Sequence, residues 1–155
     1  MKLVLLDFDG VLNSHRYLYS PERPTDMEFL GNEHYMLDPV AIGRVNTILK
    51  VTGAKVVISS SWRHGWTMDR LREILLAAGF VGEVLDKTPT GPTGSCRGDE
   101  IDMWLQENGE GHDPFVILDD DSDMGHMAKY HVKTTFAEGI LDEHVEEVVR
   151  RLMVK

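Results

Sequence analysis

Asp7 and Asp9 stand two residues apart, directly after a short apolar run at residues 2–6. An aspartate in this place can attack phosphorus and form an acyl phosphate, provided that a metal ion screens the repulsion between the two anions. The second carboxyl group can protonate the leaving oxygen and later activate a water molecule. Gly10 lets the chain turn, so that both side chains can face one small site. Taken alone, such a pair is about as often solvated loop carboxylates as catalytic groups.

A second acidic pair, Asp119 and Asp120, directly follows the apolar run at residues 115–118. Carboxylates gathered at one edge of a sheet repel one another unless a divalent cation lies between them. Oxygen ligands suit Mg²⁺ better than zinc, and the seven histidines are scattered without zinc-ligand spacing. The two acidic pairs together therefore predict a magnesium site.

Groups suited to binding a phosphoryl group also follow apolar runs or precede helices. Ser59 and Ser60 end the run at residues 55–58, where their hydroxyl and backbone N–H groups can bind phosphate at the start of a helix. Arg97 begins a later helix, where a cation can neutralise a transferring phosphoryl group. Lys87 is a competing candidate for that role. The sequence alone does not choose between the two serines or between the two cations.

Trp62 and Arg63 come directly after the serines. For Trp62 we favour packing against the helix that follows it over stacking on a substrate. Arg63 is a candidate substrate ligand, and its partner is either a phosphate or a structural carboxylate. The pattern does not separate these two possibilities.

The elements that position these residues alternate along the chain. Continuous apolar runs at residues 2–6, 55–58 and 115–118 are typical of strands buried on both faces, and residues 81–85 and 132–136 are weaker strands. Apolar residues at helical spacing predict helices within 38–53, 67–79 and 97–109, a short one around 124–127, and a last one with Val145, Val148, Val149 and Leu152 on one side. This alternation predicts an open, mostly parallel α/β sheet with helices on both faces. Ligands of such sheets lie at the carboxyl ends of the strands, where the candidate residues gather.

The 155 residues fit a single domain, 1–155, and a polar and aromatic stretch at 14–37 forms a long excursion near the predicted site. The net charge of −10 disfavours nucleic-acid binding through a broad basic face, although a local basic cleft remains compatible with it. The single cysteine forms no internal disulfide, which suits a reducing cytosol. No leader or membrane-spanning apolar run is evident, so we expect a cytoplasmic protein without a membrane partner.

Taken in order, four short segments resemble the motifs of the haloacid dehalogenase (HAD) superfamily of phosphotransferases. They are Asp7-Phe8-Asp9-Gly10-Val11, Val57-Ile58-Ser59-Ser60, Arg97, and Ile117-Leu118-Asp119-Asp120. The segments at residues 59–63 and 97–105 are further similar to a small capless branch of that superfamily, found in bacteria and phages. Relatives of this branch include HAD domains of nucleic-acid repair proteins.

The resemblance implies a Rossmann-like core and a phosphoaspartyl intermediate on Asp7. In the family's pattern Asp7 is nucleophile and Mg²⁺ ligand, and Asp9 is the general acid/base and a metal ligand through its backbone carbonyl. Ser59 or Ser60 binds the phosphoryl group, and Arg97 stands where the family usually has lysine. The resemblance also implies that Asp119 and Asp120 complete the metal site and that Asp123 holds a metal-bound water.

The acid at Asp9 favours phosphate-ester hydrolysis, because family members that cleave other bonds do not need a carboxylic acid there. The chain is too short for a large cap, so only residues 14–37 and 87–96 would enclose the site. An open site suits a bulky substrate such as a nucleic-acid end, and a small phosphate ester is equally compatible. Two other classes of function stay open: a receiver-like domain, and a noncatalytic module that binds phosphate or nucleic acid.

Overall fold

The computed structural model describes residues 1–24, 32–109 and 113–154. Within these residues five parallel strands form one open sheet in the order β3-β2-β1-β4-β5. Their bounds are β1 Leu3–Leu6, β2 Lys55–Ile58, β3 Val84–Lys87, β4 Phe115–Asp119 and β5 His131–Lys133. The chain extends the sheet from β1 in one direction and then returns to β4 on the other side of β1. The order of the strands therefore reverses between β1 and β4, which is where ligands of such sheets bind.

The register of the central strands aligns the candidate residues. Leu6 lies opposite Ile58 of β2 and Leu118 of β4. The next residue of each strand therefore leaves the sheet at the same level. The backbone N–H of Asp7 donates to the Leu118 carbonyl (3.0 Å), and that of Ser59 donates to the Leu6 carbonyl (2.8 Å).

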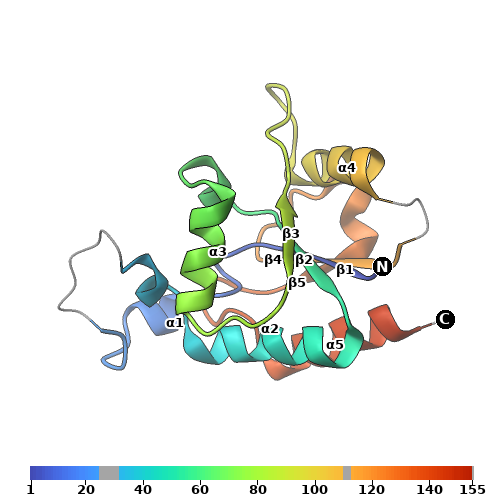
Figure 1. Cartoon of the computed structure of the whole chain (residues 1–155). Coiled ribbons are helices and arrows are strands. Elements are labelled where there is room, and N and C mark those ends of the chain that lie inside the picture. The colour runs from blue at the N-terminus through green and yellow to red at the C-terminus, as the bar shows by residue number, and fades with distance from the viewer. Residues whose placement is uncertain (25–31, 110–112, 155) are drawn as a thin grey trace.

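Helices cover both faces of the sheet, as the alternating pattern predicted (Figure 1). One face, which includes Val4 and Leu6, packs against α2 (Pro39–Thr52), α3 (Met68–Ala77) and α5 (Asp142–Met153). The other face, which includes Leu3 and Leu5, packs against α4 (Arg97–Asn108) and the 3-10 helix η3 (Gly125–Tyr130). Burying each of these side chains contributes roughly 1.5–3 kcal/mol. Apolar side chains on both faces explain why the strands read as continuous apolar runs.

The predicted caps of α2 are present. The Asp38 carboxylate accepts a hydrogen bond from the Val40 N–H (2.9 Å), and Pro39 occupies the first helical turn. Gly53 ends the helix with a φ of 74°. These local signals are independent of the rest of the fold, which is why the sequence located both ends of this helix.

The two outer strands differ from their predicted positions. The third strand is Val84–Lys87 rather than residues 81–85, because Val81 is 79% exposed in the turn after α3. The fifth strand is His131–Lys133 rather than residues 132–136, and Phe136 is 43% exposed in the turn that follows. Edge strands this short bury few apolar side chains, so the hydrophobic pattern of the sequence does not locate their ends.

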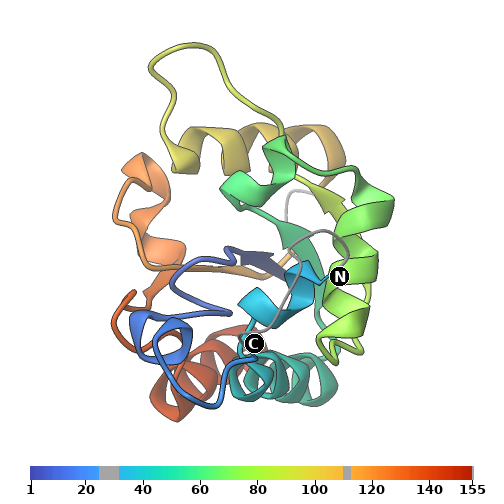
Figure 2. The ribbon, with the colours of Figure 1, turned by 90° about the vertical axis from the view of Figure 1, so that its left-hand side faces the viewer.

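The excursion at 14–37 contains the short helix α1 (His15–Leu18) and the 3-10 helix η1 (Glu33–Met36), while its middle, 25–31, lies outside the described residues. The Tyr17 hydroxyl donates to the Tyr35 carbonyl (3.0 Å), and Glu33 forms an ion pair with Arg70 of α3. The loop between β3 and α4 projects from the body of the molecule in two perpendicular views (Figures 1 and 2). None of the helices in residues 1–24, 32–109 and 113–154 has both the length and the apolar composition of a membrane span.

Candidate active site

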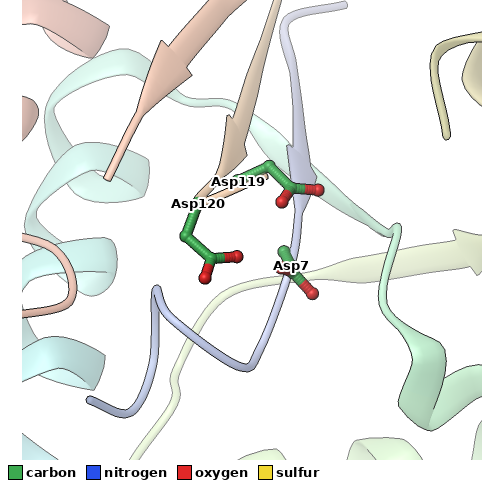
Figure 3. Close-up of side chains that lie close together, drawn as sticks. All are labelled: Asp7, Asp119 and Asp120. Atoms are coloured by element: carbon green, nitrogen blue, oxygen red, sulfur yellow. The ribbon is translucent and has the colours of Figure 1, made fainter. Parts of the chain in front are cut away.

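Three carboxylates meet where the strand order reverses. Asp7 follows β1, Asp119 is the last residue of β4, and Asp120 comes next. One oxygen of each carboxylate lies within 4.8 Å of the others. Figure 3 shows the three side chains close together at the ends of two neighbouring strands. The structure thus brings together the two acidic pairs of the sequence through Asp7, Asp119 and Asp120.

The turn after β1 fits tightly around Asp120. Gly10 has a φ of 82°, and a Cβ atom at this position would overlap the Asp120 carboxyl group. A hydrogen bond from the Thr134 hydroxyl to the Gly10 carbonyl (2.5 Å) ties the turn to the end of β5. Glycine is therefore required here for its backbone conformation and for the space it leaves.

Backbone N–H groups orient the two buried carboxylates. The Phe8 N–H donates to Asp7 Oδ1 (2.8 Å), and the Asp121 N–H donates to Asp119 Oδ1 (2.9 Å). Burial raises the pKa of Asp7 to about 9, and repulsion from Asp119 adds to the effect. Burial likewise raises the pKa of Asp119. The Arg97 guanidinium opposes both shifts in pKa without cancelling them.

A divalent cation would balance the negative charge that these three carboxylates place close together. The donors are all oxygen atoms, and a cation among them would favour the ionised form of each carboxyl group. Oxygen ligands are those that Mg²⁺ prefers. Asp7, Asp119 and Asp120 are thus a group that can hold such an ion.

Arg97 is the cation next to this cluster. Its Nη1 lies 3.6 Å from Asp7 Oδ1 and 3.4 Å from Asp119 Oδ2, and it donates a hydrogen bond to the Ser59 carbonyl. Lys87 instead donates to the carbonyls of Arg63 (3.1 Å) and Trp66 (3.3 Å). Of the two cations that the sequence left open, Arg97 is therefore the one beside the carboxylates, and its contact with a phosphoryl group stays a prediction.

Close packing of α4 brings Arg97 to this position. Gly98 is buried, and a Cβ atom on it would overlap the carbonyl of Met124. The Asp123 carboxylate accepts a hydrogen bond from the Arg97 N–H (3.3 Å), and the backbone carbonyl of Asp123 accepts one from the Gly98 N–H (3.1 Å). Asp123 thus binds the first turn of α4, and a contact between its side chain and a metal-bound water stays a prediction.

The two serines differ in their hydrogen bonding. Ser60 Oγ accepts a hydrogen bond from the Trp62 N–H (3.2 Å) and caps the 3-10 helix η2 (Ser61–His64). Ser59 Oγ is buried and has no hydrogen-bond partner among the described residues. A buried hydroxyl without a partner is unfavourable, and a ligand oxygen would satisfy it. Of the two serines, Ser59 has the available hydroxyl.

Arg63 is paired with a structural carboxylate, one of the two partners that the sequence left open. It is buried, its Nη2 lies 2.7 Å from Glu100 Oε1 of α4, and its Nη1 donates to the Ser60 carbonyl (2.9 Å). The other Glu100 oxygen accepts a hydrogen bond from the Gly91 N–H (2.9 Å). This ion pair connects η2, α4 and the loop between β3 and α4. A direct contact between Arg63 and substrate stays a prediction.

The Asp9 carboxylate is not a member of the cluster. Asn13 Nδ2 donates to its Oδ1 (2.9 Å), and Trp62 Nε1 lies 3.1 and 3.2 Å from its two oxygens. Trp62 packs edge-on against Phe8, with 5.3 Å between the ring centres. Sequence reasoning weighed packing and substrate stacking for Trp62 and missed its contact with Asp9. The available signal was its place just after Ser59 and Ser60, at the same sheet edge as Asp9.

The comparison with protein-family models agrees with this geometry. A family model described as the HAD domain in Swiss Army Knife RNA repair proteins matches residues 3–145, which is most of the chain and includes every residue of the site. A comparison with curated proteins gives no significant match. The match favours the HAD interpretation over the receiver-like one. The chain therefore belongs to the family of HAD domains in Swiss Army Knife RNA repair proteins, within the superfamily of HAD-type phosphoryl-transfer hydrolases.

Proposed function

We propose that this protein is a Mg²⁺-dependent phosphomonoester hydrolase that acts through a phosphoaspartyl intermediate on Asp7. The observation that supports this most strongly is the approach of the Asp7, Asp119 and Asp120 oxygens to within 4.8 Å at the strand ends. Three carboxylates so close together, two of them buried, are unfavourable unless they bind a cation.

The metal site would consist of the carboxylates of Asp7, Asp119 and Asp120, with the Asp9 carbonyl as a further ligand. A Mg²⁺ ion bound there would offset part of the negative charge of the carboxylates and the phosphate, so that the two anions could come into contact. Arg97 lies beside the same carboxylates and contributes a fixed positive charge for the phosphoryl oxygens. The Ser59 hydroxyl, which has no partner among the described residues, would donate to another of those oxygens.

In the first step an Asp7 carboxylate oxygen forms a bond to phosphorus as the bond from phosphorus to the leaving oxygen breaks. The electron pair of that bond goes to the leaving oxygen, which takes a proton from Asp9. The products of this step are an alcohol and the phosphorylated Asp7.

In the second step Asp9, now a carboxylate, takes a proton from water as the water oxygen attacks the same phosphorus. The bond from phosphorus to the Asp7 oxygen breaks, and inorganic phosphate leaves. Asp7 and Asp9 return to their starting forms. Asp9 therefore serves both steps from one position, which requires its carboxyl group to be held still.

The family description names RNA repair, so the substrate class we propose is the phosphorylated end of an RNA strand. The net charge of −10 supports recognition of a terminal phosphate by the site rather than of the backbone by a basic surface. A small phosphate ester is the alternative substrate.

The test is hydrolysis of p-nitrophenyl phosphate and of RNA oligonucleotides with 3′- or 5′-phosphate, with Mg²⁺ and with EDTA. Asp7→Asn should lower turnover by more than about 1,000-fold, because it removes the nucleophile. Asp69→Asn is the matched control, since the Asp69 side chain is 93% exposed on α3. Equal turnover in EDTA, or full activity of Asp7→Asn, would exclude the proposal. A long-lived phosphoprotein, or RNA binding without turnover, would favour the receiver-like or noncatalytic alternative.

The serines provide a second test of the site. Ser59→Ala should raise KM or lower kcat by about 10-fold with little change in stability, because it removes a hydroxyl that has no partner among the described residues. Ser60→Ala should instead lower the free energy of unfolding by about 1 kcal/mol, since it removes the cap of η2. Kinetics and urea unfolding of both variants measure this difference. The reverse pattern would assign phosphate binding to Ser60.

A further inference from the structure

We infer that Trp62 is a positioning residue, which holds the Asp9 carboxyl group in place for proton transfer through its indole N–H. This inference rests on the proposed function, in which Asp9 is the general acid/base. Trp62 Nε1 lies 3.1 Å from Asp9 Oδ1 and 3.2 Å from Asp9 Oδ2, so one N–H is shared between both oxygens. The family match and the motifs assign no role to Trp62.

The contact keeps Asp9 apart from the metal-binding carboxylates. The Asp9 side chain lies outside the group formed by Asp7, Asp119 and Asp120, although Asp9 is only two residues from Asp7. Trp62 binds both oxygens, and Asn13 Nδ2 binds Oδ1 (2.9 Å). Asn13 in turn accepts a hydrogen bond from the Gly10 N–H (3.0 Å), which fixes the turn. Together the two donors restrict the rotation of the Asp9 side chain.

The chemical nature of the indole suits this position. Its N–H is a donor only, so it neither takes the proton from Asp9 nor supplies one to the substrate. A hydrogen bond to a carboxylate is stronger than one to the neutral acid. Through this contact Trp62 holds the direction of the Asp9 carboxyl group and takes no part in the proton transfer itself.

The position of Trp62 is itself well determined. Its backbone N–H donates to Ser60 Oγ (3.2 Å), and its ring packs against the buried Phe8 ring. The next residue, Arg63, is bound to Glu100 of α4 through a buried ion pair (2.7 Å). The indole therefore has a fixed direction before any substrate binds, as a group that positions a catalytic side chain requires.

The test uses Trp62→Phe, which keeps an aromatic ring beside Phe8 and removes the N–H. The matched control is Trp66→Phe, the same change at a partly buried tryptophan that packs on the same core. The readout is kcat/KM for p-nitrophenyl phosphate, whose leaving group needs little protonation, and for an alkyl phosphate, whose leaving group needs a proton. Trp62→Phe should lower kcat/KM for the alkyl phosphate by about 10-fold to 100-fold and that for p-nitrophenyl phosphate by less than about 3-fold.

Trp66→Phe should leave the ratio of the two kcat/KM values unchanged. A merely structural role for Trp62 would lower both values by the same factor, and that result would overturn the inference. An unchanged ratio in Trp62→Phe at full activity would overturn it as well.

A second readout needs no turnover. The indole ¹H–¹⁵N resonance that disappears in Trp62→Phe should shift when Asp9 is replaced by alanine and should not shift in Asp69→Ala. If the protein hydrolyses neither substrate, the proposed function fails while this resonance still tests the contact. If it hydrolyses both substrates and the resonance does not respond to Asp9→Ala, the inference alone fails.

Discussion

The ionised form of the Asp7 carboxyl group is unfavourable in the folded protein. Its pKa is raised to about 9, first by burial and then by Asp119, from an ordinary value of 3.8. Between these two pH values the unfolded chain loses the proton that the folded chain retains. The contribution of Asp7 to stability is therefore greatest below about pH 3.8 and is lost as the pH rises toward 9.

Asp7→Asn should thus stabilise the metal-free protein at neutral and alkaline pH. We expect the free energy of unfolding in EDTA at pH 8 to rise by about 2 kcal/mol, with a smaller gain at pH 5. Urea unfolding at several pH values measures the effect. Added Mg²⁺ should reverse the order, because the ion stabilises the wild-type protein and binds the variant less well. Equal pH dependence of the two proteins in EDTA would contradict this account.

At the scale of elements, the position of α4 depends on Gly98, which has no side chain to separate the helix from Met124. A Cβ atom at Gly98 would overlap the Met124 carbonyl, so Gly98→Ala must move the first turn of α4, and Arg97 with it. We expect a loss of about 2 kcal/mol in the free energy of unfolding and at least about a 10-fold loss in kcat/KM. Thermal unfolding and kinetics measure the two effects.

Gly43→Ala in α2 is the matched control for this prediction. Gly43 is exposed and a Cβ atom there meets nothing within 4 Å. The same substitution should therefore stabilise the protein by about 0.5–1 kcal/mol through helix propensity. Unchanged kinetics of Gly98→Ala would show that Arg97 does not depend on this contact.

The central strands were predictable because their side chains are buried on both faces. Val4 and Leu6 pack on one side and Leu3 and Leu5 on the other, so β1 reads as one apolar run that ends in Asp7. The parallel arrangement then placed the residues after β1, β2 and β4 at one edge. The outer strands have weaker patterns, and their bounds were wrong by one to three residues.

The contacts of individual side chains at the site could not be read from the sequence. Lys87 ends β3 and Arg97 begins α4, and the packing of Gly98 against Met124 together with the contacts of Asp123 brings Arg97 to the carboxylates. The 3-10 helix η2 is too short for a periodic pattern, so the direction of the Trp62 indole was not predictable. Both are tertiary effects between segments far apart in the chain.

At the scale of the whole molecule, the acidic surface determines how an RNA substrate is approached. With a net charge of −10, we expect contacts to the terminal phosphate and to few others. The logarithm of kcat/KM for a phosphorylated RNA end should then fall against the logarithm of salt concentration with a slope near about −1. A slope steeper than about −4, or a strong gain with oligonucleotide length, would instead indicate a basic groove along the backbone.

The buried ion pair between Arg63 and Glu100 links two segments of this site, the 3-10 helix η2 and the first turn of α4. The turn with Arg63 also holds Trp62, and the helix with Glu100 begins at Arg97. Loss of either partner would leave a lone buried charge at a cost of about 3–5 kcal/mol and would shift both segments. A substitution at Arg63 or at Glu100 therefore requires a compensating substitution at the other residue. Among related chains, positions 63 and 100 are therefore expected to vary together, and a neutral residue at one should accompany a neutral residue at the other.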